Sequence, residues 1–139
     1  MEADRGPAGV PQLDVPEMDA DHAELLALAH TLSEGLHGGM PTFWVLERLD
    51  DLLSLTLRHF DREEGLLTET AYPHLMEHVH SHNRLLRAML QFREDVRHQR
   101  YRTELAVQFI RAWVVEHVRM EDTRYARHLH AGAAAAGGD

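Results

Sequence analysis

The stretch HFDREEGLLTETAYPHLMEHVHSH, residues 59–82, contains five histidines distributed on both sides of a turn. Residues four apart in a helix lie on the same face. His59 and Glu63 therefore share a face before the turn, and His78 and His82 share one after it. We predict two neighbouring helices that direct these four side chains into a common core.

The same alternation of three and four residues continues through most of the chain, which is typical of helices packed along narrow seams. Each of the four seams is apolar at its ends and polar at one level. The seams are Met18, His22, Leu25, Ala29, Leu32 and Leu36; Val45, Leu49, Leu52, Thr56, His59, Glu63 and Leu66; Leu75, His78, His82, Leu85, Met89, Phe92 and Val96; and Ala106, Ile110, Trp113 and His117. The four helical seams predict an all-α fold. Short connections between them predict an antiparallel up-down-up-down four-helix bundle.

Two local features refine this prediction. Thr42 follows Pro41 and is a plausible N-cap of the second helix. After His117 the seam spacing slips, because the next consistent set starts at Asp122, five residues later instead of four. One extra residue in a helix predicts a π-bulge, a feature often found at functional sites.

Composition limits the classes of protein and site. The 139 residues suffice for one domain, and 44% of them are hydrophobic. The formal net charge is −9, and the 14 basic residues are all arginines scattered along the chain, which disfavours a nucleic-acid partner. Because the chain contains no cysteine, thiolate metal sites and disulfides are excluded.

The two ends differ from the rest of the chain. Residues 1–17 are proline-containing and predict an N-terminal arm, residues 18–130 form the predicted bundle, and residues 131–139 are a low-complexity C-terminal tail. The N-terminus lacks the basic start and long apolar core of a signal peptide, and no apolar run is long enough to span a membrane, so we expect neither kind of segment. We therefore expect a cytoplasmic protein without a membrane partner. We also expect a monomer.

Counting from the turns places the polar residues of the four helices at one depth. His59 matches His82, Glu63 matches His78, and the last turn brings His117 to the same level. Burying unpartnered charged groups costs several kcal/mol each, against a net stability of about 5–15 kcal/mol, so a metal centre is the most economical explanation. The candidate ligands are His22, His59, Glu63, His78, His82, His117 and Asp122.

Ligand type and number constrain the metal. Imidazoles and carboxylates without thiolate suit iron, manganese, zinc, copper or nickel, so ligand type alone does not identify the ion. Five imidazoles and two carboxylates exceed what one ion can use. Two ions bridged by Glu63 and Asp122 would accommodate all seven and leave a position free.

With these motifs the chain resembles a hemerythrin of the single-domain bacterial kind, over roughly residues 13–129. The resemblance rests on MDADH at 18–22, HFDREE at 59–64, YPHLMEHVHSH at 72–82, and WVVEHVRMED at 113–122 followed by Tyr125. It implies two iron ions joined by an oxo or hydroxo bridge. By the same resemblance, one iron would be held by His78, His82 and His117 and the other by His22 and His59, with Glu63 and Asp122 bridging.

The resemblance also implies a function, which is reversible binding of dioxygen at the iron that has two histidines, for oxygen storage, transport or sensing. A dry apolar pocket would protect that position. The residues that match the family's pocket are Leu25, Phe60, Trp113, Val114 and Val118. No catalytic residue is predicted. Two alternatives stay open: a di-iron enzyme acting on peroxide or nitric oxide, and a redox- or metal-responsive interaction module with an unknown protein partner.

Single residues have simpler explanations, since a lone seam histidine is more often a hydrogen-bonded core residue than a ligand. Only the joint placement of seven residues favours a metal. Glu77 and His80 form one ExxH pair, of the kind that ferritin-like bundles use twice, but it faces outward. We expect the remaining histidines at the surface, namely His30, His37, His74, His80, His98, His128 and His130, and we expect Glu64, Glu69 and Glu77 in solvent or beside the ligands.

Overall fold

The computed structural model describes residues 16–118 and 125–131. Four long helices make up most of it: α1 (Pro16–His37), α2 (Thr42–Glu69), α3 (Leu75–Arg97) and α4 (Thr103–His117). A short helical segment, residues 125–131, follows α4. These described ranges contain no strand, which confirms the predicted all-α class.

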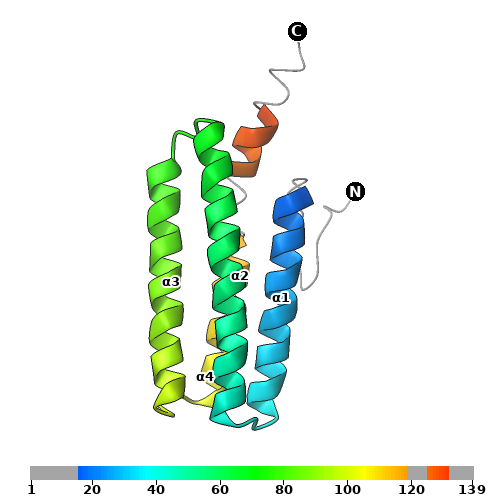
Figure 1. Ribbon diagram of the computed structural model, residues 1–139, viewed down its shortest axis with the longest axis vertical. Helices are drawn as coiled ribbons and strands as arrows, with labels where there is room; N and C mark the ends of the chain where they lie inside the picture. The colour runs from blue at the N-terminus through cyan, green and yellow to red at the C-terminus, as the bar shows by residue number, and fades with distance from the viewer. Residues whose placement is uncertain (1–15, 119–124, 132–139) are drawn as a thin grey trace.

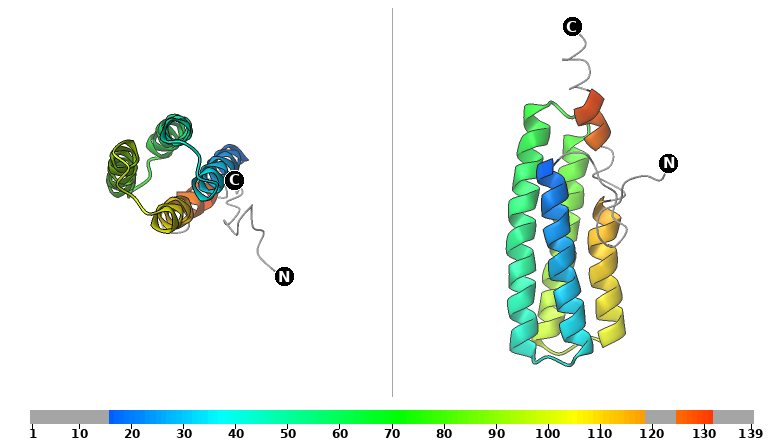
Figure 2. Two further views of the ribbon diagram at one scale, coloured as in Figure 1. Left: turned by 90° about the horizontal axis from the view of Figure 1, so that it is seen from below. Right: turned by 90° about the vertical axis from the view of Figure 1, so that its right-hand side faces the viewer.

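The four helices lie side by side along the long axis of the molecule (Figure 1). Viewed along that axis, they surround a common centre (Figure 2). α1 packs against both α2 and α4, and α2 also packs against α3. The arrangement is consistent with the predicted four-helix bundle, and the segment 125–131 lies near the end where α2 connects to α3 (Figure 1).

The connection between α1 and α2 differs from the prediction in one detail. The chain turns through Gly39, whose φ of 69° lies in the left-handed region that glycine adopts without steric cost. Pro41, in an extended conformation, occupies the N-cap position of α2. Thr42 is therefore already helical and the predicted capping role is wrong, because the locked φ of proline suits the position immediately before the helix. The Thr42 hydroxyl instead accepts a hydrogen bond from Gln99 at 3.4 Å.

The predicted seams form the core, with one shift in register. The seam residues of α1 are all buried. At the end of α2, Leu67 is fully buried, whereas the predicted Leu66 is half-buried. The side chain that continues the seam is thus displaced by one residue at this end of the helix.

The apolar core has two parts, which lie on either side of the polar level. The larger cluster includes Leu25, Leu52, Met89 and Ile110. The smaller cluster consists of Met18, Leu67, Tyr72 and Tyr125. Along α1 the buried residues run from Met18 through His22 to Leu25, so the buried histidine lies between the two clusters. Apolar side chains therefore shield the polar level from both ends.

The contact between α1 and α2 is especially close near the connecting loop. A Cβ atom added at Gly35 would lie 2.0 Å from Cζ3 and 2.3 Å from Cη2 of Trp44. The guanidinium of Arg48 covers the ring of Trp44 at 5.5 Å from its centroid. Only glycine at position 35 lets the indole pack directly on the backbone of α1.

The ends of the described chain bear on the predicted boundaries. α1 begins at Pro16, so it includes the last two residues of the predicted arm. The rest of the arm, and the predicted tail beyond residue 131, lie outside the described residues. Within the described ranges, no helix combines the length and the apolar character needed to cross a bilayer.

Candidate metal centre

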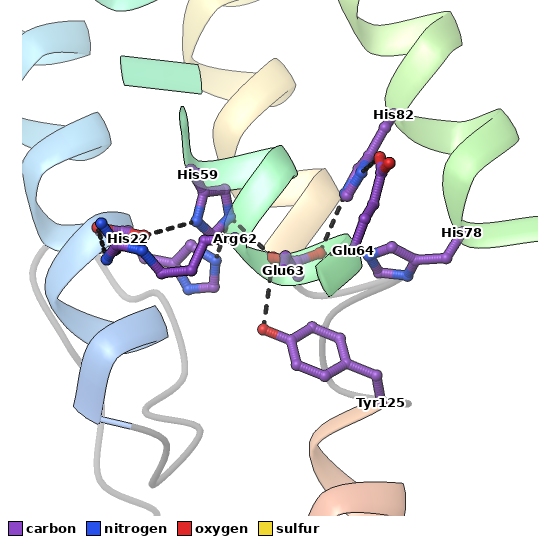
Figure 3. A network of polar contacts seen from close by, with 9 residues as sticks. His22, His59, Arg62, Glu63, Glu64, His78, His82 and Tyr125 are labelled. Atoms are coloured by element: carbon purple, nitrogen blue, oxygen red, sulfur yellow. Dashed lines mark hydrogen bonds and ion pairs between the residues drawn. The ribbon is translucent and has the colours of Figure 1, made fainter. Parts of the chain in front are cut away.

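Five of the seven predicted ligands meet at the polar level of the core (Figure 3). α1 contributes one, and α2 and α3 contribute two each, one helical turn apart. All five side chains are buried: His22, His59, Glu63, His78 and His82. The helical spacing read from the sequence is what brings each pair of neighbours to the same face.

Glu63 lies at the centre of the cluster and is fully buried. Its Oε2 atom is 2.8 Å from Nε2 of His59, and its Oε1 atom is 3.0 Å from Nε2 of His82. Oε1 also contacts Nε2 of His78. On the other side, Nε2 of His22 is 3.2 Å from Nε2 of His59. The two carboxylate oxygens therefore face two different groups of imidazoles.

These contacts define two potential metal sites that share one carboxylate. The ligand atoms of His22, His59 and Glu63 all lie within 4.8 Å of one another, and so do those of Glu63, His78 and His82. Two ligands bound to one ion at about 2.1 Å and at a right angle lie about 3.0 Å apart. The spacing of the Nε2 and carboxylate oxygen atoms fits that geometry on both sides of Glu63.

Glu63 is anionic in this environment. Burial by itself would raise the pKa of Glu63, but hydrogen bonds to His59, His78 and His82 and the charge of His59 lower that pKa well below its ordinary value. A carboxylate that stays ionised inside the core is a suitable bridging ligand for two cations.

Two further carboxylates hold the outer nitrogens of two of the histidines. Asp21 Oδ2 accepts a hydrogen bond from His59 Nδ1 at 3.1 Å, and Glu64 Oε2 accepts one from His82 Nδ1 at 2.6 Å. Arg62 in turn donates from Nη1 to both oxygens of Asp21, each at 3.1 Å.

These outer contacts determine what the inner nitrogens can do. A metal ion binds the lone pair of an imidazole nitrogen, so with an ion at Nε2 the ring proton of His59 and of His82 would reside on Nδ1, where Asp21 and Glu64 accept it. Each Nε2 would then be free to bind the ion that Glu63 also contacts. Outer carboxylates that hold the Nδ1 proton are the usual partners of metal-binding histidines, so the donor set fits a pair of metal ions.

The remaining two predicted ligands are not tested by these contacts. His117 is the last residue of α4, but its side chain is outside what the structure describes. Asp122 lies outside the described residues. The chain is π-helical at Val118, directly after His117, which agrees with the predicted extra residue.

The predicted oxygen-pocket residues are all buried, and three have specific neighbours. Phe60 stacks face to face on His82, with ring centroids 3.6 Å apart. Trp113 donates a hydrogen bond from Nε1 to the carbonyl oxygen of Leu85 at 2.9 Å. Val114 borders a cavity of about 320 Å³ between α1 and α4. The other two pocket residues, Leu25 and Val118, have almost no exposed surface.

Sequence reasoning gave no role at the centre to three residues, although Tyr125 is among those that carry the family resemblance. Asp21 and Arg62 were not predicted to act there, although Asp21 directly precedes His22 and Arg62 follows His59 by three positions. The Tyr125 hydroxyl donates to Glu63 Oε2 at 3.4 Å. Glu64, expected in solvent or beside the ligands, lies beside His82.

The histidines expected at the surface are outside the centre. Six are exposed, namely His30, His37, His74, His80, His98 and His130. His128 is half-buried and donates from Nε2 to the carbonyl oxygen of Thr70 at 2.9 Å.

Comparison with known proteins agrees with a metal-binding helical domain. The family model described as "Hemerythrin HHE cation binding domain" matches residues 13–129. A bacteriohemerythrin from Stenotrophomonas maltophilia is 25% identical over 125 residues, which cover 86% of this chain and 77% of the relative. A hemerythrin-like protein from Naegleria gruberi is 24% identical over 109 residues, covering 78% and 80% of the two chains.

Solved structures share the fold. The crystal structure of a wild-type hemerythrin superposes with a TM-score of 0.74 at 21% sequence identity, covering 83% of this chain and 88% of the other. The crystal structure of a hemerythrin mutant matches with the same TM-score, identity and coverage. At this level of identity the structural likeness establishes the fold alone.

Proposed function

The chain belongs to the hemerythrin family, whose domain binds metal ions, and on this premise we propose that it binds dioxygen reversibly at a non-haem di-iron centre. The proposed domain spans residues 18–130, with the up-down-up-down topology that its short connections support. Oxygen storage, delivery or sensing would all use this property.

The observation that carries the proposal is the position of Glu63. One oxygen of this buried carboxylate faces His59, and the other faces His78 and His82. Such a shared carboxylate is what a pair of neighbouring ions requires, whereas a single ion would use only one side. We assign His22 and His59 to one iron and His78, His82 and His117 to the other, with Asp122 as a second bridge.

The surroundings suit reversible binding. A di-iron centre supplies two electrons that a bound dioxygen molecule can accept and return. The protein's contribution is to keep water and acids away from that position. Two apolar clusters enclose the polar level, and the Phe60 ring lies beside both His59 and His82, with ring centroids 5.8 and 3.6 Å away. We therefore propose that the chain is an oxygen carrier and not an enzyme.

The test is iron content together with the optical spectrum of the reduced protein. We expect two iron ions per chain and an absorption band that appears on exposure to oxygen and disappears on deoxygenation. Irreversible oxidation with turnover of peroxide or nitric oxide would instead indicate an enzyme. One zinc ion per chain would rule out the di-iron proposal.

A matched pair of variants makes the test specific to the centre. Glu63→Gln removes the shared charge and should abolish the oxygen-dependent band. Glu69→Gln, at the exposed end of the same helix, should leave iron content and the band unchanged. Equal behaviour of the two variants would contradict the role assigned to Glu63.

A further inference from the structure

The two outer carboxylates of the centre differ in their own partners. Asp21 is engaged by Arg62, which donates to both of its oxygens. Glu64 accepts from His82, and within the described residues no arginine lies at ion-pair distance from it. Asp21 is the more buried of the two, with 11% of its side chain exposed against 32% for Glu64.

This difference changes the donor strength of the two imidazoles. A carboxylate that accepts the Nδ1 proton of a histidine pushes electron density toward Nε2 and makes that nitrogen a better ligand. A guanidinium bound to the same carboxylate withdraws part of that density, because the negative charge is shared between two donors. His59 is therefore the weaker donor and His82 the stronger one.

We propose that Asp21 and Arg62 are a positioning pair that orients His59 toward the metal while limiting its donor strength. The inference rests on the proposed two-metal centre and concerns the site formed by His22 and His59. Arg62 lies beside these residues in Figure 3, and 49% of its side chain is exposed. The arginine can thus be replaced without opening the core.

The proposal predicts effects of opposite sign for the two members of the pair. Asp21→Asn removes the anion behind His59 and leaves Arg62 uncompensated, so the ion should bind more weakly. Arg62→Gln removes a cation near the ion, while Asp21 still holds His59, so the ion should bind more tightly. A purely structural role would weaken binding in both variants.

The experiment is a titration of the metal-free protein with Co²⁺, followed by absorption and by metal analysis. We expect two Co²⁺ per chain in the wild type, and Asp21→Asn should weaken one of the two binding steps by about tenfold or more. Arg62→Gln should strengthen that same step, and the gain should shrink at about 1 M salt because the arginine is partly exposed. The double variant should fall between the two.

Arg58→Gln is the matched control, since Arg58 is exposed on the same helix one turn earlier. It should bind Co²⁺ as the wild type does. The absence of a gain in Arg62→Gln would overturn the proposal even if Asp21→Asn failed to fold, and so would a similar gain in Arg58→Gln.

The outcomes separate this inference from the proposed function. Two bound Co²⁺ with unchanged affinities in both variants would overturn the inference and leave the oxygen-binding proposal standing. If Asp21→Asn weakens and Arg62→Gln strengthens Co²⁺ binding, but the iron-loaded protein shows no reversible oxygen band, the inference is supported and the proposed function is overturned. A wild type that binds no Co²⁺ would overturn both.

Discussion

Replacing Gly35 with alanine should destabilise the bundle, although alanine normally favours a helix. Alanine gains up to about 1 kcal/mol over glycine in a helix interior. At this position, however, the new Cβ would lie 2.0 Å from a ring carbon of Trp44, whereas carbon atoms pack best at about 3.5–4.0 Å. Moving the indole costs about 1–3 kcal/mol, so the net result is a loss of up to about 2 kcal/mol.

Gly65→Ala is the matched control, because it lies within α2 and nothing would come within 4 Å of its added Cβ. That variant should gain up to about 1 kcal/mol, so the two should differ by about 1–3 kcal/mol. The assay is urea unfolding of the metal-free protein followed by far-UV circular dichroism, with tryptophan fluorescence reporting displacement of Trp44. With a urea slope of about 2 kcal/mol/M, the difference separates the midpoints by about 0.5–1.5 M.

The explanation can be refuted in two ways. Gly35→Ala that stabilises the protein as much as Gly65→Ala would show that the indole moves freely and that the contact does not restrain α1. Trp44→Ala removes the obstacle, so in that background Gly35→Ala should no longer be destabilising. If Gly35→Ala still lowers the free energy of unfolding in the Trp44→Ala background, the indole is not the cause of the destabilisation.

Three further predictions concern the metal centre and the helices around it. His117→Ala should lower iron content, whereas His80→Ala should not, and equal iron contents by metal analysis would show that the helix register is wrong. The pKa of Glu63 is lowered in the folded protein, so ionisation of this carboxyl stabilises the metal-free fold above the ordinary pKa of 4.5. This stabilisation should be lost as the pH falls from 4.5 toward the lowered pKa. Urea unfolding between about pH 6 and 3 should show the loss, and a flat profile would contradict it. Trp113→Phe removes the hydrogen bond to the Leu85 carbonyl and should cost about 1 kcal/mol in urea unfolding, with little change in iron content.

The helices and the grouping of five polar residues could be predicted because they depend on short-range periodicity. His59 and Glu63 share a face whatever the rest of the chain does, and the same holds for His78 and His82. Depth followed from counting residues back from each turn. His22, on a separate helix, was placed by the same count, and the structure brings it to the predicted level.

The contacts that the sequence could not predict depend on how one helix is rotated and shifted against another. Asp21 reaches His59 and Arg62 on a neighbouring helix, and a small axial shift of α1 would have separated them. The change of seam residue from Leu66 to Leu67 has a related cause. A seam with a repeat of about 3.5 residues drifts by about 20° per heptad on a straight helix of about 3.6 residues per turn, and α2 is 28 residues long.

The adjacency of Asp21 and His22 has a kinetic consequence. Of these consecutive residues of α1, His22 is a proposed ligand of the candidate metal centre, and Asp21 accepts a hydrogen bond from His59, a second proposed ligand on α2. Detachment of α1 would therefore remove one proposed ligand and release a second in the same event. The lifetime of an ion bound on this side of Glu63 would then follow the opening rate of a helix, and two such bundles with equal equilibrium affinity for a metal could differ widely in how long they retain it.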